Sequence, residues 1–379
     1  MDRRAWVAGP GGRAQRPLPR GRRGPVQSPR APGGRGGPSH GPLPARPGVT
    51  ATPRRLVLLA VVVLVASAFS VSFGASGLGP GDLWRALSAD GDPTARSILL
   101  QLRLPRAALA ALVGGALGLS GCTFQALLRN PLAEPYVLGV SGGAAVGAVA
   151  VVVSGIGVIL PWTLPVGAFL GAVAAMALVL GVARRASPGR MDTRVLILSG
   201  VIIGAFFNAM ILLMLSIADV ESFRSAIFWM MGNLSGADWG STALLAVLLV
   251  PAGAAVLSLA RAFNLLSRGE EVAHYLGASV QRVKLTAYLA ASLMVAAAVA
   301  AAGVIGFVGL IVPHAVRLAW GNDHRMLLPA SFLAGTAFLL VADTVARLVV
   351  APAELPTGVV TAVAGVPFFV ALLMRGGRR

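Results

Sequence analysis

Residues that serve catalytic and metal sites are scarce in this sequence. Its 379 residues include one cysteine, four histidines and 14 acidic side chains. The single cysteine, Cys122, excludes an internal disulfide and a cluster of thiolate ligands. The two nearest histidines, His314 and His324, are ten positions apart and show no ligand spacing. We therefore expect the chain to bind no metal ion or other cofactor and to carry no catalytic residue.

Lysine is also nearly absent, which bears on nucleotide binding. A phosphate-binding loop needs a glycine-rich run followed by a lysine that contacts the phosphates. The one lysine, Lys284, lies in the sequence RVKLT with no glycine run before it. The chain lacks this ATP-binding motif. If ATP drives its activity, we expect a separate subunit to use the ATP and Mg²⁺.

Charged residues are few and apolar residues abundant. Charged residues make up 12% of the chain and apolar residues 56%, and the mean hydropathy is +0.78. This balance excludes a water-soluble domain and predicts an all-α membrane protein. A helix needs about 20 mostly apolar residues to cross the hydrocarbon core. Ten stretches qualify, at 56–75, 107–127, 136–154, 161–183, 194–216, 239–260, 284–302, 304–320, 327–350 and 358–374.

Glycines four positions apart recur inside these stretches. Such pairs let two helices approach closely in lipid and predict tight packing. They occur at 114 and 118, 143 and 147, 167 and 171, and 200 and 204.

Much of the net charge of +18 precedes the first apolar stretch. Residues 1–53 are rich in arginine, proline and glycine and too poor in apolar residues to offset the entropy of ordering. We predict a disordered cytoplasmic tail over 1–53 and a transmembrane permease domain over 54–379. Contact with RNA or anionic lipid is the functional alternative, although aromatic residues are not interleaved with the arginines. A start assigned too far upstream is a further alternative.

Basic residues between the spans give the orientation, since short cytoplasmic loops carry an excess of them. With the N-terminus inside, the inner connections and the C-terminal tail hold Arg129, Arg184, Arg185, Arg190, Arg261, Arg268, Arg282, Lys284, Arg325, Arg375, Arg378 and Arg379. The outer connections hold fewer, except the first, which has Arg85, Arg96, Arg103 and Arg106. We predict cytoplasmic N- and C-termini and expect a specific role for the outer arginines.

Segment 218–238 differs from the spans. Its apolar residues recur at helical spacing over a piece too short to cross, at Phe223, Ile227, Phe228 and Met231. We predict an interfacial helix at the outer surface, with Trp229 and Trp239 at headgroup depth.

Asp343 is the one acidic residue that falls inside a predicted span. An ionisable residue at membrane depth suggests a functional role such as a proton relay. Arg347 follows four positions later, so a local ion pair near the outer end of the span is the alternative. We favour the pair, because a proton-coupled carrier usually has several carboxylates within the membrane.

Four regions combine proline, glycine and charged residues in an unusual way. They are RLPR, SGCTFQ and RNPLAEPYVLGVSGG within 103–143; EEVAHYLGA at 270–278; GVIGFVGLIVPHAVR at 303–317; and DTVAR with ELPTG within 343–358. With these motifs the chain closely resembles the FecCD-type permeases over about residues 56–375. The resemblance implies the type II architecture of an ATP-binding-cassette (ABC) importer permease in the cytoplasmic membrane of a prokaryote, which moves iron siderophores, haem or vitamin B12.

The resemblance also implies partners and their contact residues. A second permease copy or a paralogue completes the path, two ATP-binding subunits dock from the cytoplasm, and a soluble binding protein delivers substrate from outside. Residues matching the binding-protein contacts are Arg103, Arg106 and Arg347. Residues matching the cytoplasmic gate are Asn130 and Leu132. Residues matching the coupling surface for the ATPase are Glu271, Ala273, Leu276, Gly277 and Ala278.

Each assignment has an alternative. Arg103 and Arg106 would otherwise anchor a helix at the interface, and 270–278 would otherwise be a solvated turn. For the whole chain the alternative is a secondary carrier or channel that uses Asp343. The basic tail departs from the family pattern.

Overall fold

The structure, a computed structural model, describes residues 51–74, 79–86 and 92–376. Every regular element in these residues is a helix, as expected for an all-α protein. The tail predicted over 1–53 lies almost wholly outside the described residues, and only its last three residues belong to the first helix.

Ten helices lie at the ten predicted spans. They are α1 (Ala51–Ser72), α4 (Leu104–Leu127), α5 (Val140–Val153), α7 (Thr163–Ala186), α8 (Thr193–Ser216), α10 (Trp239–Ser258), α13 (Val280–Ala302), α14 (Val308–Trp320), α15 (His324–Leu348) and α16 (Thr357–Gly376). Among the described residues, seven helices are long and apolar enough to cross a membrane, while α5, α14 and the apolar part of α16 are shorter.

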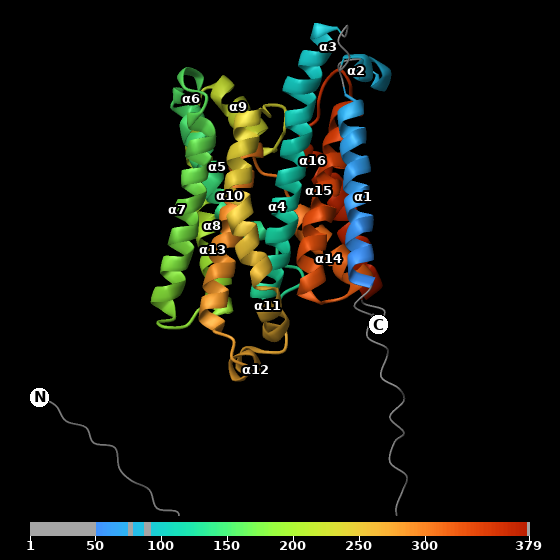
Figure 1. Cartoon of the computed structure of the whole chain (residues 1–379). Helices are drawn as coiled ribbons and strands as arrows, with labels where there is room; N and C mark the ends of the chain where they lie inside the picture. Colours follow the sequence, from blue (N-terminus) through green and yellow to red (C-terminus); the bar gives the residue numbers. More distant parts are fainter. Residues whose placement is uncertain (1–50, 75–78, 87–91, 377–379) are drawn as a thin grey trace, which may run out of the picture. The chain divides into compact units, whose positions relative to one another are not determined.

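Short helices occupy the connections. They are α2 (Pro80–Ala86), α3 (Pro93–Ser97), the π-helical η1 (Ile98–Arg103), the 3₁₀ turn η2 (Pro135–Leu138), α6 (Ile156–Ile159), α9 (Val220–Met230), α11 (Ala260–Leu266) and α12 (Glu270–Tyr275). Figure 1 shows α2, α3, α6 and α9 at one end of the bundle, which we call the α3 end, and α12 at the opposite, α12 end. The start of α1 and the end of α16 lie at the α12 end.

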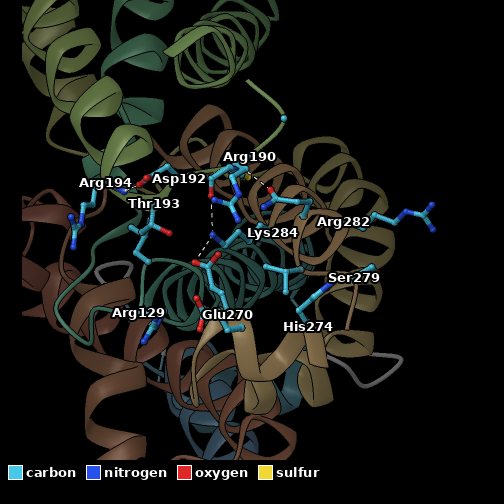
Figure 2. Close-up of a pocket in the computed structure, with 16 residues that line it drawn as sticks. Arg129, Arg190, Asp192, Thr193, Arg194, Glu270, His274, Ser279, Arg282 and Lys284 are labelled. Carbon is cyan, nitrogen blue, oxygen red and sulfur yellow. Dashed lines mark hydrogen bonds and ion pairs between the residues drawn. The ribbon is translucent and has the colours of Figure 1, made fainter. Parts of the chain in front are cut away.

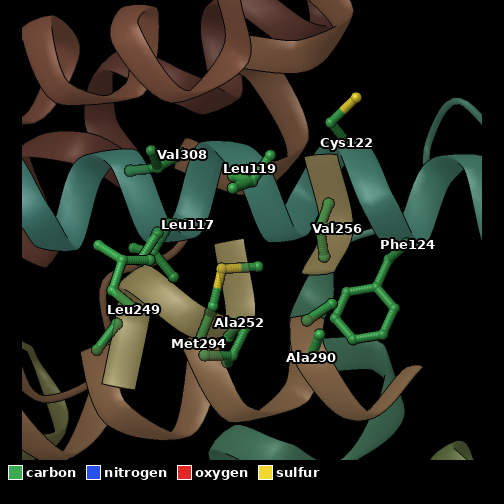
Figure 3. Close-up of a cluster of buried hydrophobic side chains, with 14 of the residues drawn as sticks. Leu117, Leu119, Cys122, Phe124, Leu249, Ala252, Val256, Ala290, Met294 and Val308 are labelled. Atoms are coloured by element: carbon green, nitrogen blue, oxygen red, sulfur yellow. The ribbon is translucent and has the colours of Figure 1, made fainter. Parts of the chain in front are cut away.

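Helix α4 is central to the packing. It packs against α10, α13, α14 and α15. Its side chains join those of α10, α13 and α14 in a buried apolar cluster, drawn in Figure 3. In lipid this packing, and not burial away from water, holds the helices together.

Glycine contacts confirm three of the four predicted pairs. Gly114 and Gly118 lie against the backbone of α15. The glycines at 143 and 147 in α5 and at 167 and 171 in α7 face each other, backbone to backbone. In the fourth pair Gly200 lies against η2, but a Cβ at Gly204 would meet open space. The backbone nitrogen of Gly204 nevertheless lies close to Gly139, so this position is approached on its backbone side.

Gln125 of α4 donates to backbone carbonyls of α14, one of which lacks a donor within its own helix. Pro313 lies inside α14 and has no N–H to offer the carbonyl of Gly309. Gln125 Nε2 instead lies 3.4 Å from the carbonyl oxygen of Gly309 and 3.2 Å from that of Leu310. A buried carbonyl without a donor costs about 1–3 kcal/mol. The glutamine thus stabilises the proline-containing helix from its neighbour.

The chain breaks between α13 and α14, at residues 303–307, as the sequence predicted for the region around Gly303. With 13 residues, α14 is about 20 Å long, less than the roughly 30 Å of the hydrocarbon core. The break therefore lies at membrane depth, where polar backbone groups must find partners inside the protein. The N–H of Phe307 donates to Glu134 Oε1 at 3.0 Å, and Tyr136 OH donates to the carbonyl of Ile305 at 2.8 Å.

Helix α9 confirms the short helix predicted within 218–238. Asp219 caps it, because its Oδ1 accepts hydrogen bonds from the N–H groups of Glu221 and Ser222, both at 3.0 Å. Trp239 opens α10 and its Nε1 donates to the carbonyl of Leu100 at 2.9 Å. The headgroup depth of Trp229 and Trp239 stays a prediction.

Candidate docking and coupling sites

Four charged side chains meet at the α3 end. This cluster, which we call the arginine cluster, consists of Arg106, Asp343, Arg347 and Glu354. Asp343 is fully buried, and Arg106 donates to both its carboxylate oxygens from Nε and Nη2, at 2.9 to 3.2 Å. Arg347 Nε lies 3.1 Å from Asp343 Oδ2, one helical turn away. Two guanidinium groups thus balance the buried carboxylate.

Arg106 also links α4 to the loop between α15 and α16. Its Nη1 lies 2.8 Å from Glu354 Oε2. The side chain of Glu354 is 34% exposed, against 11% for Arg106. Glu354 is therefore the member of the arginine cluster that solvent reaches most easily.

Arg103 and Arg347 hold the end of α1. Arg103 Nη1 donates to the carbonyls of Val71 and Ser72, both at 2.9 Å. Arg347 donates to the carbonyls of Ser70 at 3.0 Å and Phe73 at 3.1 Å. The last carbonyls of a helix lack partners within it, and a cation near them is favourable. The two arginines therefore cap α1 and attach it to η1, directly before α4, and to α15.

The local pair of Asp343 with Arg347, favoured over a proton relay, is confirmed. Arg106 and Glu354 complete the cluster from distant parts of the chain, which the sequence did not reveal. The arginines predicted to meet a binding protein, Arg103, Arg106 and Arg347, are largely buried and make hydrogen bonds within the chain. Their docking role stays a prediction, and any partner must meet them through their exposed edges or through Glu354.

Helix α12 presents an apolar patch at the α12 end. Ala273 is fully buried and seats the helix on the bundle. Tyr275 and Leu276 are 87% and 61% exposed, and Val272 is 43% exposed. Large apolar side chains grouped on a projecting helix mark a surface for a protein partner.

The predicted coupling residues divide between the two faces of this region. Glu271, Leu276 and Gly277 are exposed and Ala278 is half-buried, whereas Ala273 faces the bundle. Val272 and Tyr275 were missed. Their apolar character and helical spacing with Leu276 were the available signal. Coupling itself stays a prediction for all of these residues.

A pocket of about 920 Å³ opens beside α12, between the turn before α8 and the first turns of α13. Half of the residues that line it are charged, among them Arg129, Arg190, Asp192, Arg194 and Glu270 (Figure 2). Lys284 lies at its centre and is hydrogen-bonded to two separate elements.

The predicted gate residues lie in the loop after α4. Asn130 is exposed and its Oδ1 accepts a hydrogen bond from the N–H of Leu132 at 2.9 Å. Leu132 is 42% exposed. The loop continues to Glu134 and Tyr136, which hold the break before α14. The gating role of Asn130 and Leu132 stays a prediction. The hydrogen bonds of Glu134 and Tyr136 connect their loop to the break before α14.

Comparisons with known proteins agree over nearly all the described residues. The pattern of the FecCD transport family matches residues 59–375. The hemin transport system permease protein HmuU of Yersinia pestis is 39% identical over 333 residues, which cover 85% of this chain and 96% of that protein. The vitamin B12 import system permease protein BtuC of Escherichia coli O139:H28 is 40% identical over 325 residues, covering 86% and 96%.

A solved structure shares the fold. It is the inward-facing conformation of an ABC transporter assigned to the metal-chelate type, with a TM-score of 0.75 and 32% sequence identity. The match covers 85% of this chain and 99% of that chain.

Proposed function

Because the chain belongs to the FecCD transport family and is the membrane-spanning permease subunit of an ABC importer, we propose that it carries a bulky metal chelate, with a ferric siderophore as its substrate. The likeness to a metal-chelate type transporter over 85% of the chain carries the proposal. Hemin and vitamin B12, named for two relatives, are also bulky metal chelates and are the next candidates.

The protein is a multi-pass protein of a bacterial inner membrane, and its family works with an ATPase and a binding protein. We assign the α12 end to the cytoplasm and the α3 end to the outside. The basic inner loops support this assignment, as do Arg190 and Arg194 at the pocket beside α12. Both ends of the transmembrane domain then face the cytoplasm.

The ATPase is assigned to the exposed face of α12. The support is the patch of Val272, Tyr275 and Leu276, because an exposed aromatic side chain flanked by aliphatic ones is typical of interface anchors. Glu271 and Gly277 lie beside it. The ATP and Mg²⁺ belong to that partner subunit, and the path is completed by a second copy of this chain.

The binding protein is assigned to the α3 end. Arg103, Arg106 and Arg347 contribute positive charge there, in excess over Asp343 and Glu354. An acidic side chain of the partner would be attracted to this local excess of positive charge, and the effect would fall with salt.

The experiment that tests the function is uptake into proteoliposomes that contain the permease with its ATPase and binding protein. Ferric siderophore, hemin and cobalamin are offered separately, with and without ATP. We expect ATP-dependent accumulation of the ferric siderophore. Accumulation of hemin alone, or of cobalamin alone, would identify that compound as the substrate in place of the ferric siderophore. Uphill uptake by the permease without the ATPase would contradict the whole assignment.

A further inference from the structure

Lys284, the one lysine of the chain, joins three elements at the α12 end. It lies in the second turn of α13, and its side chain is only 3% exposed. Its Nζ lies 2.6 Å from Glu270 Oε1 and 2.8 Å from the carbonyl oxygen of Met191 (Figure 2). Glu270 is the first residue of α12, and Met191 lies in the turn that leads into α8. One ammonium group thus connects α12, α13 and the start of α8.

Met191 is held by α13 through both its backbone N–H and its backbone carbonyl. The N–H of Met191 donates to Gln281 Oε1 at 2.7 Å, and its carbonyl accepts from Lys284. Asp192 follows directly and caps α8, because its Oδ1 accepts the N–H of Arg194 at 2.7 Å. The position of the first turn of α8 therefore depends on the two polar side chains of α13.

The Glu270 side of the connection is the polar attachment of α12. Apart from the buried methyl group of Ala273, α12 meets the bundle through few side chains. Within the described part of the chain, the bond from Lys284 to Glu270 is the one side-chain hydrogen bond that ties α12 to another element. Gly269, with a φ of 120°, precedes it as a turn. A displacement of α12 relative to α13 would thus strain the bond to Lys284.

We infer that Lys284 is the positioning residue through which movement of α12 reaches α8. A buried ammonium that lost one acceptor would be left with an uncompensated charge, so the three elements are favoured to move together. Packed elements also shift between discrete arrangements and transmit force without deforming. The inference rests on the proposed docking of the ATPase at α12, and it adds the route by which the effect of the nucleotide enters the bundle.

The structure offers variants that separate this role from simple stabilisation. Glu270→Ala cuts the link to α12 and leaves the bond from Lys284 to Met191. Lys284→Met removes both bonds and keeps the length of the side chain. Arg282→Gln is the matched control, since Arg282 is exposed on the same turns of α13 and points away from the pair (Figure 2).

The test follows the start of α8 with a fluorophore. A bimane label is attached to a cysteine introduced by Arg194→Cys, a position that is exposed. The native Cys122 is buried, and the protein without Arg194→Cys, treated with the same reagent, serves as the blank. The labelled permease is purified with its ATPase subunit, and emission is compared without nucleotide and after trapping with ATP and vanadate. Binding of the ATPase and the melting temperature are measured in parallel.

We expect wild type and Arg282→Gln to show the same nucleotide-dependent change in emission. Glu270→Ala and Lys284→Met should lose at least half of that change, with ATPase binding within about twofold of wild type for Glu270→Ala, because its exposed α12 face is intact. An unchanged response in Glu270→Ala would overturn the inference. Loss of ATPase binding in that variant would also overturn it, because the pair would then only seat α12. If the wild-type chain bound no ATPase, the proposed function itself would fail, a result distinct from both.

Discussion

Arg106 and Asp343 are 237 positions apart in the chain, yet two nitrogens of the arginine bind both carboxylate oxygens of the aspartate. This pairing fixes the start of α4 against the end of α15. Thr357 Oγ1 adds a hydrogen bond to Asp343 Oδ1 at 3.2 Å, which brings in the start of α16. A buried carboxylate thus organises the α3 end.

Removal of this carboxylate should destabilise the protein strongly. Asp343→Asn leaves the buried Arg347 without its carboxylate partner and Arg106 with Glu354 alone, at a cost of about 3–5 kcal/mol. The melting temperature in detergent measures the loss. The control is Asp82→Asn, whose partner Arg85 has a side chain 78% exposed, so its pair contributes about 0–1 kcal/mol. Equal melting temperatures for the two variants would contradict a structural role for Asp343.

Glu354 should compete with an acidic partner for Arg106. Glu354→Gln removes the exposed carboxylate and frees a guanidinium edge, so we expect the binding protein to dock several-fold more tightly, with a steeper dependence on salt. Surface plasmon resonance at two salt concentrations measures this change. Glu221→Gln, on α9 at the same end, controls for the loss of one negative charge. An equal gain in both variants would remove the specific role of Glu354.

Gln125 and Pro313 should be energetically coupled. Gln125→Leu leaves the carbonyl freed by Pro313 without a donor but also removes the buried, unpartnered Oε1 of Gln125, so we expect a net loss of about 1 kcal/mol. In a Pro313→Ala background the helix can supply its own N–H, so the same change should cost less. A double-mutant cycle on thermal stability measures the difference. If the stability losses of the two substitutions simply added, Gln125 would not be compensating for the N–H that Pro313 lacks.

Tyr275 should anchor the ATPase. Tyr275→Ala removes an exposed aromatic ring from α12, and we expect ATPase affinity to fall by about 2 kcal/mol, or roughly thirtyfold, at unchanged melting temperature. Trp162→Ala is the control, because this aromatic is also exposed and lies next to α7 at the α3 end. Unchanged ATPase binding in Tyr275→Ala would place the anchor elsewhere.

Two glycines that look alike in the sequence should respond differently to alanine. A Cβ at Gly118 would collide with the carbonyl of Ser331, so Gly118→Ala should cost about 1–3 kcal/mol. A Cβ at Gly204 would meet open space, so Gly204→Ala should be neutral or stabilising by up to about 1 kcal/mol. Thermal unfolding of the two single variants decides the matter.

The sequence predicted the spans and one local ion pair, but not the contacts between helices. Hydrophobic length located the ten spans, because the thickness of the bilayer sets the length of a crossing helix. The spacing of Asp343 and Arg347 located their pair, because residues four apart meet on a helix. Neither argument carries information on which helices are neighbours. The pairs of Arg106 with Asp343 and of Glu270 with Lys284, and the open space beside the Cα of Gly204, all depend on that arrangement.

The residues expected at the partner surfaces illustrate the same limit. Motif likeness selected Ala273 and Leu276 together, but one faces the bundle and the other faces outward. Burial depends on how a six-residue helix is seated, and α12 is too short for its own apolar period to decide this.

The hydrogen bonds from Glu134 and Tyr136 to the chain before α14 have a mechanical consequence. The loop after α4 and the 303–307 break carry backbone polar groups at membrane depth, where lipid offers no replacement for a lost partner. Pulling the loop after α4 away from the α13–α14 break would strand the N–H of Phe307 and the carbonyl of Ile305 at once. We therefore expect these two stretches to move as a single body when the pathway opens, with the hinge outside them.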